Sequence, residues 1–234
     1  MWQRLGNFVI KNRLFLLLIL FAATGVMGFF AGKVKLGYEF AKAIPLDNPK
    51  YKEYRSFQQK FGDDGNVLVV GVQTDKFFTL SVFNAYSKLH RQLRQVQYVE
   101  DVLSVPGAIA LQKDPLTDKL IPVKIFPDSL SEHSMLDSAS HVFKNLSFYK
   151  YKLYNPEEHA YLIAVRINKE ALNSVKRSKI IADITAVAKE FETATRIETY
   201  VSGLPLIRTV VADRLQEEMR FFLIGSLVLS TLIL

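Results

Sequence analysis

Two uncharged apolar runs lie near the two ends of the chain, and a long stretch of mixed polar and apolar residues separates them. The first run is Leu14 to Ala31 and the second is Phe221 to Leu234. A helix needs about twenty mostly apolar residues to cross a bilayer. The first run therefore predicts a transmembrane helix over residues 14–32. The second run is too short alone, so it predicts the start of a second span over 221–234 in a chain that continues past Leu234.

The residues before the first apolar run predict its orientation. Trp2, Leu5 and Val9 share one helical face, which is typical of an interfacial helix over residues 1–13. Three basic residues also precede the run: Arg4, Lys11 and Arg13. Positive flanks favour the cytoplasmic side, so we expect the middle of the chain outside the cytoplasm. A cleavable signal peptide is the alternative, although its apolar core is usually only about 7–15 residues long.

The stretch between the runs alternates between strand and helix patterns. Residues 33–66 predict a linker with a short helix over Tyr51 to Phe61. Residues 67–204 predict one folded domain, with an insertion over about 108–160. Strands are expected over 67–72, 99–105, 161–167 and 197–201, and helices over 80–96 and 175–194, the second capped by Asn173 or Ser174. The order β-α-β, insertion, β-α-β predicts an α+β, ferredoxin-like (split β-α-β) domain.

The insertion has elements of its own. Residues 120–126 predict a strand at a sheet edge, because Pro122 lacks a backbone donor. Ser129 and Glu132 fit a capping box before an apolar-faced helix. Residues 149–154 and 160–167 flank a predicted hairpin turn over Asn155 to Glu158.

Four aromatic residues follow that helix and form the candidate site. They are Phe148, Tyr149, Tyr151 and Tyr154. They could line a path for a hydrophobic substrate. The alternative is ordinary packing in the core and on the sheet, because aromatic side chains dominate protein cores.

Pro205 begins the last predicted helix, in the first turn where proline is tolerated. Residues 205–220 predict a connecting helix, and no breaker separates them from the apolar run at 221–234. We therefore expect one continuous helix that runs from the domain into the membrane.

Composition and motifs exclude several classes of function. The net charge is +7, but no dense block of Lys and Arg exists, so nucleic acid is not an expected partner. There is no cysteine, which excludes disulfides and thiol chemistry. No nucleotide-binding, nucleophile-elbow or metalloprotease motif occurs, and the four histidines lack metal-ligand spacing. We expect no cofactor and no enzymatic activity.

Three blocks in order resemble one transporter family. They are the basic start with its first span, the segment IPLDNPKYKEYRSFQQKFGDDGNVLVVGV, and the segment VSGLPLIRTVVADRLQEEM. Together they resemble the N-terminal part of an RND-superfamily transporter of the MMPL-like hydrophobe-exporter branch. The resemblance implies a proton-driven efflux protein of the bacterial inner membrane with a periplasmic porter domain. It implies lipid-like substrates, the rest of the transporter chain and homo-oligomers as partners.

Two departures limit what the resemblance implies. Neither apolar run contains Asp, Glu or His, so these residues hold no proton relay. The loop of about 190 residues is also short for the multidrug branch, which favours lipid-handling relatives. The alternative classes are a two-span sensor and an ABC-type permease subunit, which share the order span, domain, span.

Overall fold

The computed structural model describes residues 10–31, 45, 47–61, 64–115, 118–127 and 130–233, and the chain divides into two units, Met1–Glu39 and Phe40–Leu234. The first unit holds helix α2, Arg13–Ala31. Its window Arg13–Phe30 has a mean hydropathy of 2.1 and is the one helix among the described residues that is long and apolar enough to cross a membrane. The expected interfacial helix over 1–13 lies mostly outside the described residues.

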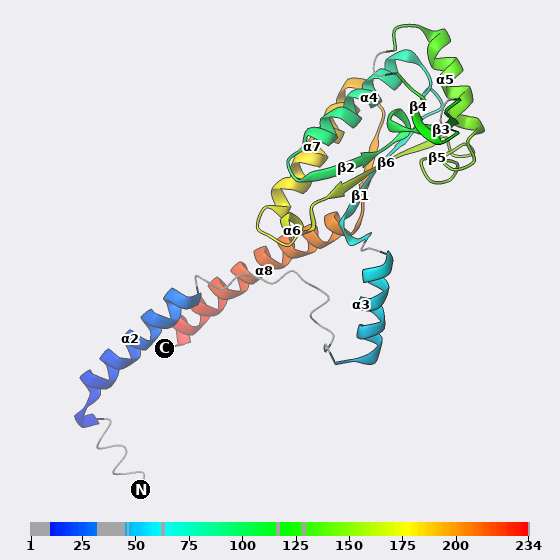
Figure 1. Cartoon of the computed structure of the whole chain (residues 1–234). Helices are drawn as coiled ribbons and strands as arrows, with labels where there is room; N and C mark the ends of the chain where they lie inside the picture. The colour runs from blue at the N-terminus through cyan, green and yellow to red at the C-terminus, as the bar shows by residue number, and fades with distance from the viewer. Residues whose placement is uncertain are drawn as a thin grey trace. The chain divides into compact units, whose positions relative to one another are not determined.

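The second unit is a mixed α+β structure with antiparallel sheets (Figure 1). Its elements are α3 (Pro49–Phe61), η2 (Asp64–Asn66), β1 (Val67–Gln73), α4 (Leu80–Gln95), β2 (Val99–Leu103), η3 (Val105–Gly107), β3 (Ile109–Lys113), β4 (Leu120–Lys124), α5 (His133–Asn145), β5 (Tyr154–Asn155), β6 (Ala160–Ile167), α6 (Lys169–Leu172), α7 (Arg177–Thr195), β7 (Thr199–Ser202) and α8 (Leu204–Ile233).

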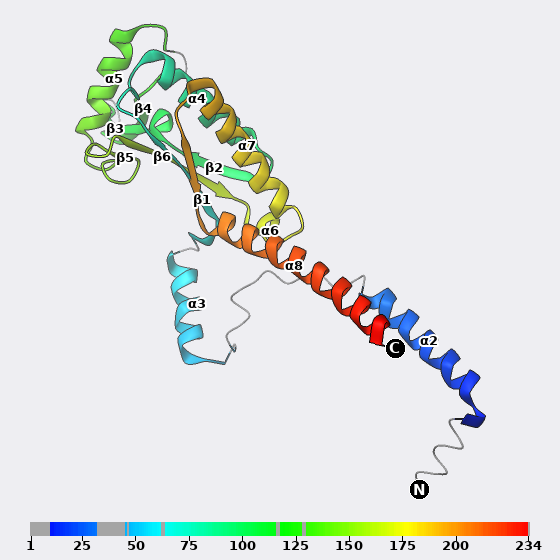
Figure 2. The same cartoon turned by 180° about the vertical axis from the view of Figure 1, so that it is seen from behind.

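The main sheet has the strand order β2-β6-β1-β7, and every neighbouring pair is antiparallel. The short strand β5 adds to β6 through Tyr154, which pairs with Tyr161. Strands β1 and β6 alternate between buried and less buried residues, as expected for a sheet with one covered face. Helices α4 and α7 contact each other and lie on one side of this sheet (Figures 1 and 2).

An aromatic cluster fills the core between α4 and the sheet. The Phe77 ring stacks on Tyr161 with centroids 3.6 Å apart, and it meets Phe83 and Tyr86 edge to face. Phe77, Phe83 and Tyr86 are fully buried. Burial raises the pKa of the Tyr86 hydroxyl well above its ordinary value and that of Tyr161 to about 12, so both remain neutral.

The insertion forms a separate two-stranded sheet and a helix. Strands β3 and β4 pair antiparallel from Ile109 opposite Lys124 to Lys113 opposite Leu120. The expected strand at 120–126 is present as β4, Leu120–Lys124. Pro122 lies in an edge strand, as expected, because both strands of a two-stranded sheet are edge strands. The partner strand β3 has no counterpart in the sequence prediction. The helix α5 is present, but the expected capping box is wrong, because α5 begins at His133 and its N-cap is Glu132, which makes no side-chain cap hydrogen bond. Ser129 lies outside the described residues.

Two boundaries differ from the prediction. The strand expected to reach residue 105 ends at Leu103, because Pro106 fixes a 3₁₀ turn at 105–107. The cap predicted at Asn173 or Ser174 is wrong, since α7 begins at Arg177 with Lys176 at its N-cap. Residues 169–172 form the separate helix α6, and Asn173 closes its C-terminal end.

Helix α8 runs unbroken from Leu204 to Ile233, so the expected continuity is confirmed. It does not meet the criteria of length and hydropathy that α2 meets, and the expected second span over 221–234 stays a prediction. Its first turns contact β1, β7 and α7, and its buried residues are Pro205 and Thr209. Gly203 makes the turn from β7 into α8 with φ of 134°, a region that favours glycine. A Cβ at this position would lie 2.7 Å from the Val67 carbonyl oxygen, so the turn accepts no side chain.

Candidate functional site

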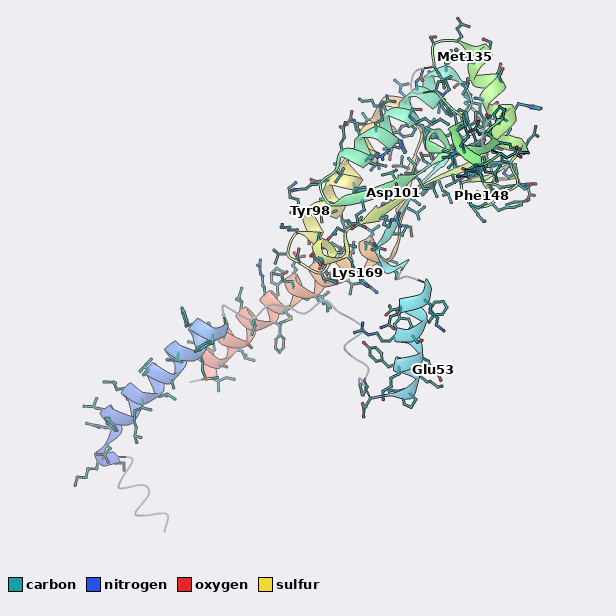
Figure 3. The ribbon with its side chains drawn as sticks, viewed as in Figure 1. Glu53, Tyr98, Asp101, Met135, Phe148 and Lys169 are labelled. Carbon is teal, nitrogen blue, oxygen red and sulfur yellow. The ribbon has the colours of Figure 1, made fainter. Side chains whose placement is uncertain are left out.

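The four predicted aromatic site residues separate into two pairs. Tyr149 and Tyr154 are buried, with 5% of each residue exposed, and both rings pack on Phe143. Phe148 and Tyr151 are 68% and 58% exposed, and a lysine amine lies over each ring. Phe148 lies at the end of the domain that holds α5 and β5 (Figure 3). The structure therefore places one pair in the core and one pair on the surface.

The Tyr149 hydroxyl has a positioning role. It accepts a hydrogen bond from the Ile109 amide at 3.0 Å and donates one to the Ile109 carbonyl at 2.8 Å. These two bonds fix the first residue of β3. Ile109 lines a surface pocket, so Tyr149 supports that pocket from the side of the core.

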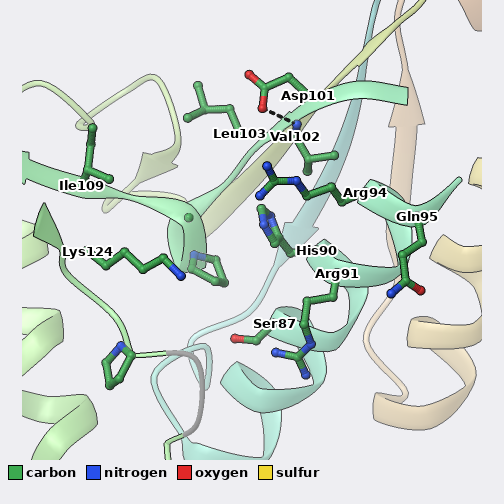
Figure 4. Close-up of a pocket in the computed structure, with 13 residues that line it drawn as sticks. Ser87, His90, Arg91, Arg94, Gln95, Asp101, Val102, Leu103, Ile109 and Lys124 are labelled. Carbon is green, nitrogen blue, oxygen red and sulfur yellow. Dashed lines mark hydrogen bonds between the residues drawn. The ribbon is translucent and has the colours of Figure 1, made fainter. Parts of the chain in front are cut away.

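This pocket has a volume of about 410 Å³ and lies between α4, β2, η3 and the β3–β4 hairpin (Figure 4). Helix α4 provides His90, Arg91 and Arg94. Strand β2 provides Asp101, and the hairpin provides Ile109 and its cross-strand partner Lys124. We call this the basic pocket.

Positive charge dominates the basic pocket. Arg91 and Arg94 are exposed, and within the described part of the chain neither guanidinium has a hydrogen bond or an ion pair. The carboxylate of Asp101 accepts bonds from Arg166 at 3.0 Å and from the Val102 amide at 2.9 Å. Its charge is thus already compensated by a cation that does not line the pocket. Asp101 therefore competes little with an incoming anion for the guanidinium groups of Arg91 and Arg94.

His90 lies in the wall of the pocket and is half-buried. Its Nδ1 lies 2.8 Å from the hydroxyl oxygen of Ser104, and its ring packs on the backbone of Gly107, where a Cβ would lie 3.2 Å from Cε1. Burial, followed by the charges of Arg94 and Arg91, lowers the pKa of His90 from its ordinary value. The lowered pKa favours the neutral imidazole, which adds no positive charge to the pocket.

The arrangement suits anion binding better than nucleophilic chemistry. Ser104 is completely buried, so no substrate reaches its hydroxyl, although a histidine lies beside it. Arginine binds phosphate and carboxylate groups through several donors in a fixed plane. The described residues contain no group of three or more His, Cys, Asp or Glu side chains that could hold a metal ion.

Sequence reasoning missed the basic pocket. The spacing of Arg91 and Arg94 places them on one helical face, which was a usable signal. Their significance depends on the β3–β4 hairpin, and β3 was not predicted. No family model matches the chain, and no curated protein matches it.

Proposed function

We propose that the chain is the N-terminal portion of a proton-driven RND-type exporter of the MMPL-like branch. In this proposal α2 crosses the bacterial inner membrane with the N-terminus in the cytoplasm, and residues 67–204 form a periplasmic porter domain. The domain gates the passage of a hydrophobic or amphipathic, lipid-like substrate. The remainder of the transporter supplies the proton pathway.

The strand order carries this proposal. The units β1-α4-β2 and β6-α7-β7 interlock so that β6 lies between β1 and β2, and β1 lies between β6 and β7. This order supports a ferredoxin-like porter domain, the build that the resemblance implies. The candidate span α2 precedes the domain, as the same layout requires.

Helix α8 supports a mechanical coupling between domain and membrane. Its N-terminal turns pack on β1 and α7, and the same unbroken helix carries the apolar residues from Phe221 to Ile233. A movement of the apolar segment would pass along a rigid helix to the sheet. The exposed rings of Phe148 and Tyr151 remain the proposed contacts of the substrate path, with Tyr149 and Tyr154 as their buried support.

The absence of native cysteine gives a direct test of topology. We expect Ala194→Cys, exposed near the end of α7, to react with a membrane-impermeant maleimide in cells whose outer membrane is permeabilised. The control Asn12→Cys, which precedes α2, should react only after lysis. Labelling of Asn12→Cys in intact cells with Ala194→Cys protected would contradict the orientation.

Transport needs its own test in the complete protein. Reconstituted in proteoliposomes, it should move a fluorescent lipid analogue when a pH gradient is imposed, and a protonophore should stop the flux. Flux that depends on ATP would instead favour the permease, and a ligand-dependent signalling output without flux would favour the sensor. Either result would reject the exporter.

A further inference from the structure

The basic pocket continues into an exposed apolar surface on the β3–β4 hairpin. Directly paired residues in antiparallel strands lie on one face, and so do residues two apart along a strand. Ile109 and Lys124 line the pocket as a pair, so the next pairs on this face are Leu111 with Pro122 and Lys113 with Leu120.

This face combines three exposed apolar side chains with Pro122 and two lysines, Lys113 and Lys124. Ile109, Leu111 and Leu120 are 43%, 63% and 63% exposed. Native two-stranded edges usually carry charged side chains, because exposed apolar strands promote aggregation. Exposed apolar side chains beside a charged pocket suit a ligand that is both apolar and charged.

We propose that the basic pocket and this hairpin face together bind an anionic amphiphile. Its phosphate or carboxylate group lies at Arg91 and Arg94, and its hydrocarbon chain lies along Ile109, Leu111 and Leu120. Charge complementarity selects the head group, and burial of the chain adds affinity with each methylene. The role of this ligand as an export substrate rests on the function proposed above, whereas the site itself does not.

The electrostatics of the wall fit such a ligand. The side chains that act on His90 are Arg91 and Arg94 from α4, Lys124 from β4 and Asp101 from β2. An anion at the arginines offsets the positive charges that disfavour protonated His90. Binding should therefore raise the pKa of His90, and affinity should increase as the pH falls through that pKa.

The test uses the whole chain in lipid nanodiscs and three soluble probes: hexyl phosphate, inorganic phosphate and hexanol. Calorimetric titration should detect hexyl phosphate with an affinity that decreases as salt is added. Hexanol should bind far more weakly, and inorganic phosphate should compete but bind less tightly than hexyl phosphate. Equal affinity of hexyl phosphate and hexanol would overturn the anion site. Equal affinity of the two phosphates would overturn the hydrocarbon site.

Matched variants locate the two halves of the site. The double variant Arg91→Gln with Arg94→Gln should weaken hexyl phosphate binding by about tenfold or more, because charge-assisted contacts are lost. The control Arg55→Gln with Arg214→Gln removes the same charge from exposed positions on α3 and α8 and should bind as the parent does. Equal losses in both variants would show a general charge effect and reject the pocket.

The hairpin half needs a second variant. Leu111→Gln should weaken binding of hexyl phosphate and leave inorganic phosphate unaffected. An unchanged affinity for hexyl phosphate would reject the hairpin as the hydrocarbon site. If the parent chain binds hexyl phosphate but the complete protein transports nothing, the proposed exporter function is rejected and the binding site stands. If the complete protein transports alkyl phosphates equally well with and without the arginine substitutions, the binding site is rejected and the exporter function stands.

Discussion

The imidazole Nδ1 of His90 and the hydroxyl oxygen of Ser104 lie 2.8 Å apart, and this contact joins α4 to the segment that follows β2. Ser104 is fully buried, so its hydroxyl depends on this partner. The pair holds the wall of the basic pocket in place. The free energy of unfolding should therefore depend on the protonation state of His90.

The pH dependence of stability should reveal His90. Its pKa is lowered in the folded state by burial and by Arg94 and Arg91, so the unfolded chain binds a proton first as the pH falls. Stability should decrease as the pH falls below the ordinary histidine value of 6.5 and level off below the folded pKa. Chemical denaturation between pH 8 and about 5 measures this slope.

The variant His90→Gln should remove most of that slope, because it has no ionisable side chain. The control His133→Gln, at an exposed position that begins α5, should keep it. A parent slope that persists in His90→Gln would show that another group titrates.

Replacement of Gly203 should destabilise the domain strongly. A side chain would meet the Val67 carbonyl at 2.7 Å in a backbone conformation with φ of 134°. We expect Gly203→Ala to lower the free energy of unfolding by about 2 kcal/mol or more. The control Gly71→Ala places its Cβ no closer than 3.5 Å to any atom and should cost less than about 1 kcal/mol. Equal stability of the two variants would contradict the proposed strain.

The hydroxyl of Tyr149 should matter more than that of Tyr151. Tyr149→Phe removes both hydrogen bonds to Ile109 and should cost about 1–2 kcal/mol in the free energy of unfolding. The Tyr151 hydroxyl donates to Glu157 at the surface, so Tyr151→Phe should cost less than about 0.5 kcal/mol. Hydrogen exchange at β3 should increase in Tyr149→Phe only; unchanged protection there would reject the positioning role.

The coupling proposed for α8 predicts a specific loss. A proline at Val210 removes a backbone donor and costs about 3 kcal/mol within the helix. The position follows Thr209, the last buried residue of α8, so the domain should stay folded. Val210→Pro should abolish transport by the complete protein, while the domain still unfolds in one cooperative transition at a lower temperature. Val210→Ala is the control, and normal transport by the proline variant would argue against a rigid connection.

The sequence by itself determined the elements whose patterns are long and local. The apolar run of α2, the amphipathic spacing of α4 and the β-branched runs of β1 and β6 each specify their structure through neighbours in the chain. The stretch after Pro205, which contains no helix-breaking signal, likewise determined α8. The cap of α7 was mispredicted, because the short helix α6 uses the residues that looked like a cap.

Only the tertiary structure decided which side chains meet. Strand β3 is only five residues long and pairs only with β4, and Tyr149 anchors it from 40 positions away in the sequence. The same folding buries Tyr149 and Tyr154 and leaves Phe148 and Tyr151 exposed, although all four look alike in the sequence. The basic pocket arises where α4, β2 and the hairpin converge. Periodicity within one segment predicts which face is buried, but only long-range packing decides which segments meet on that face.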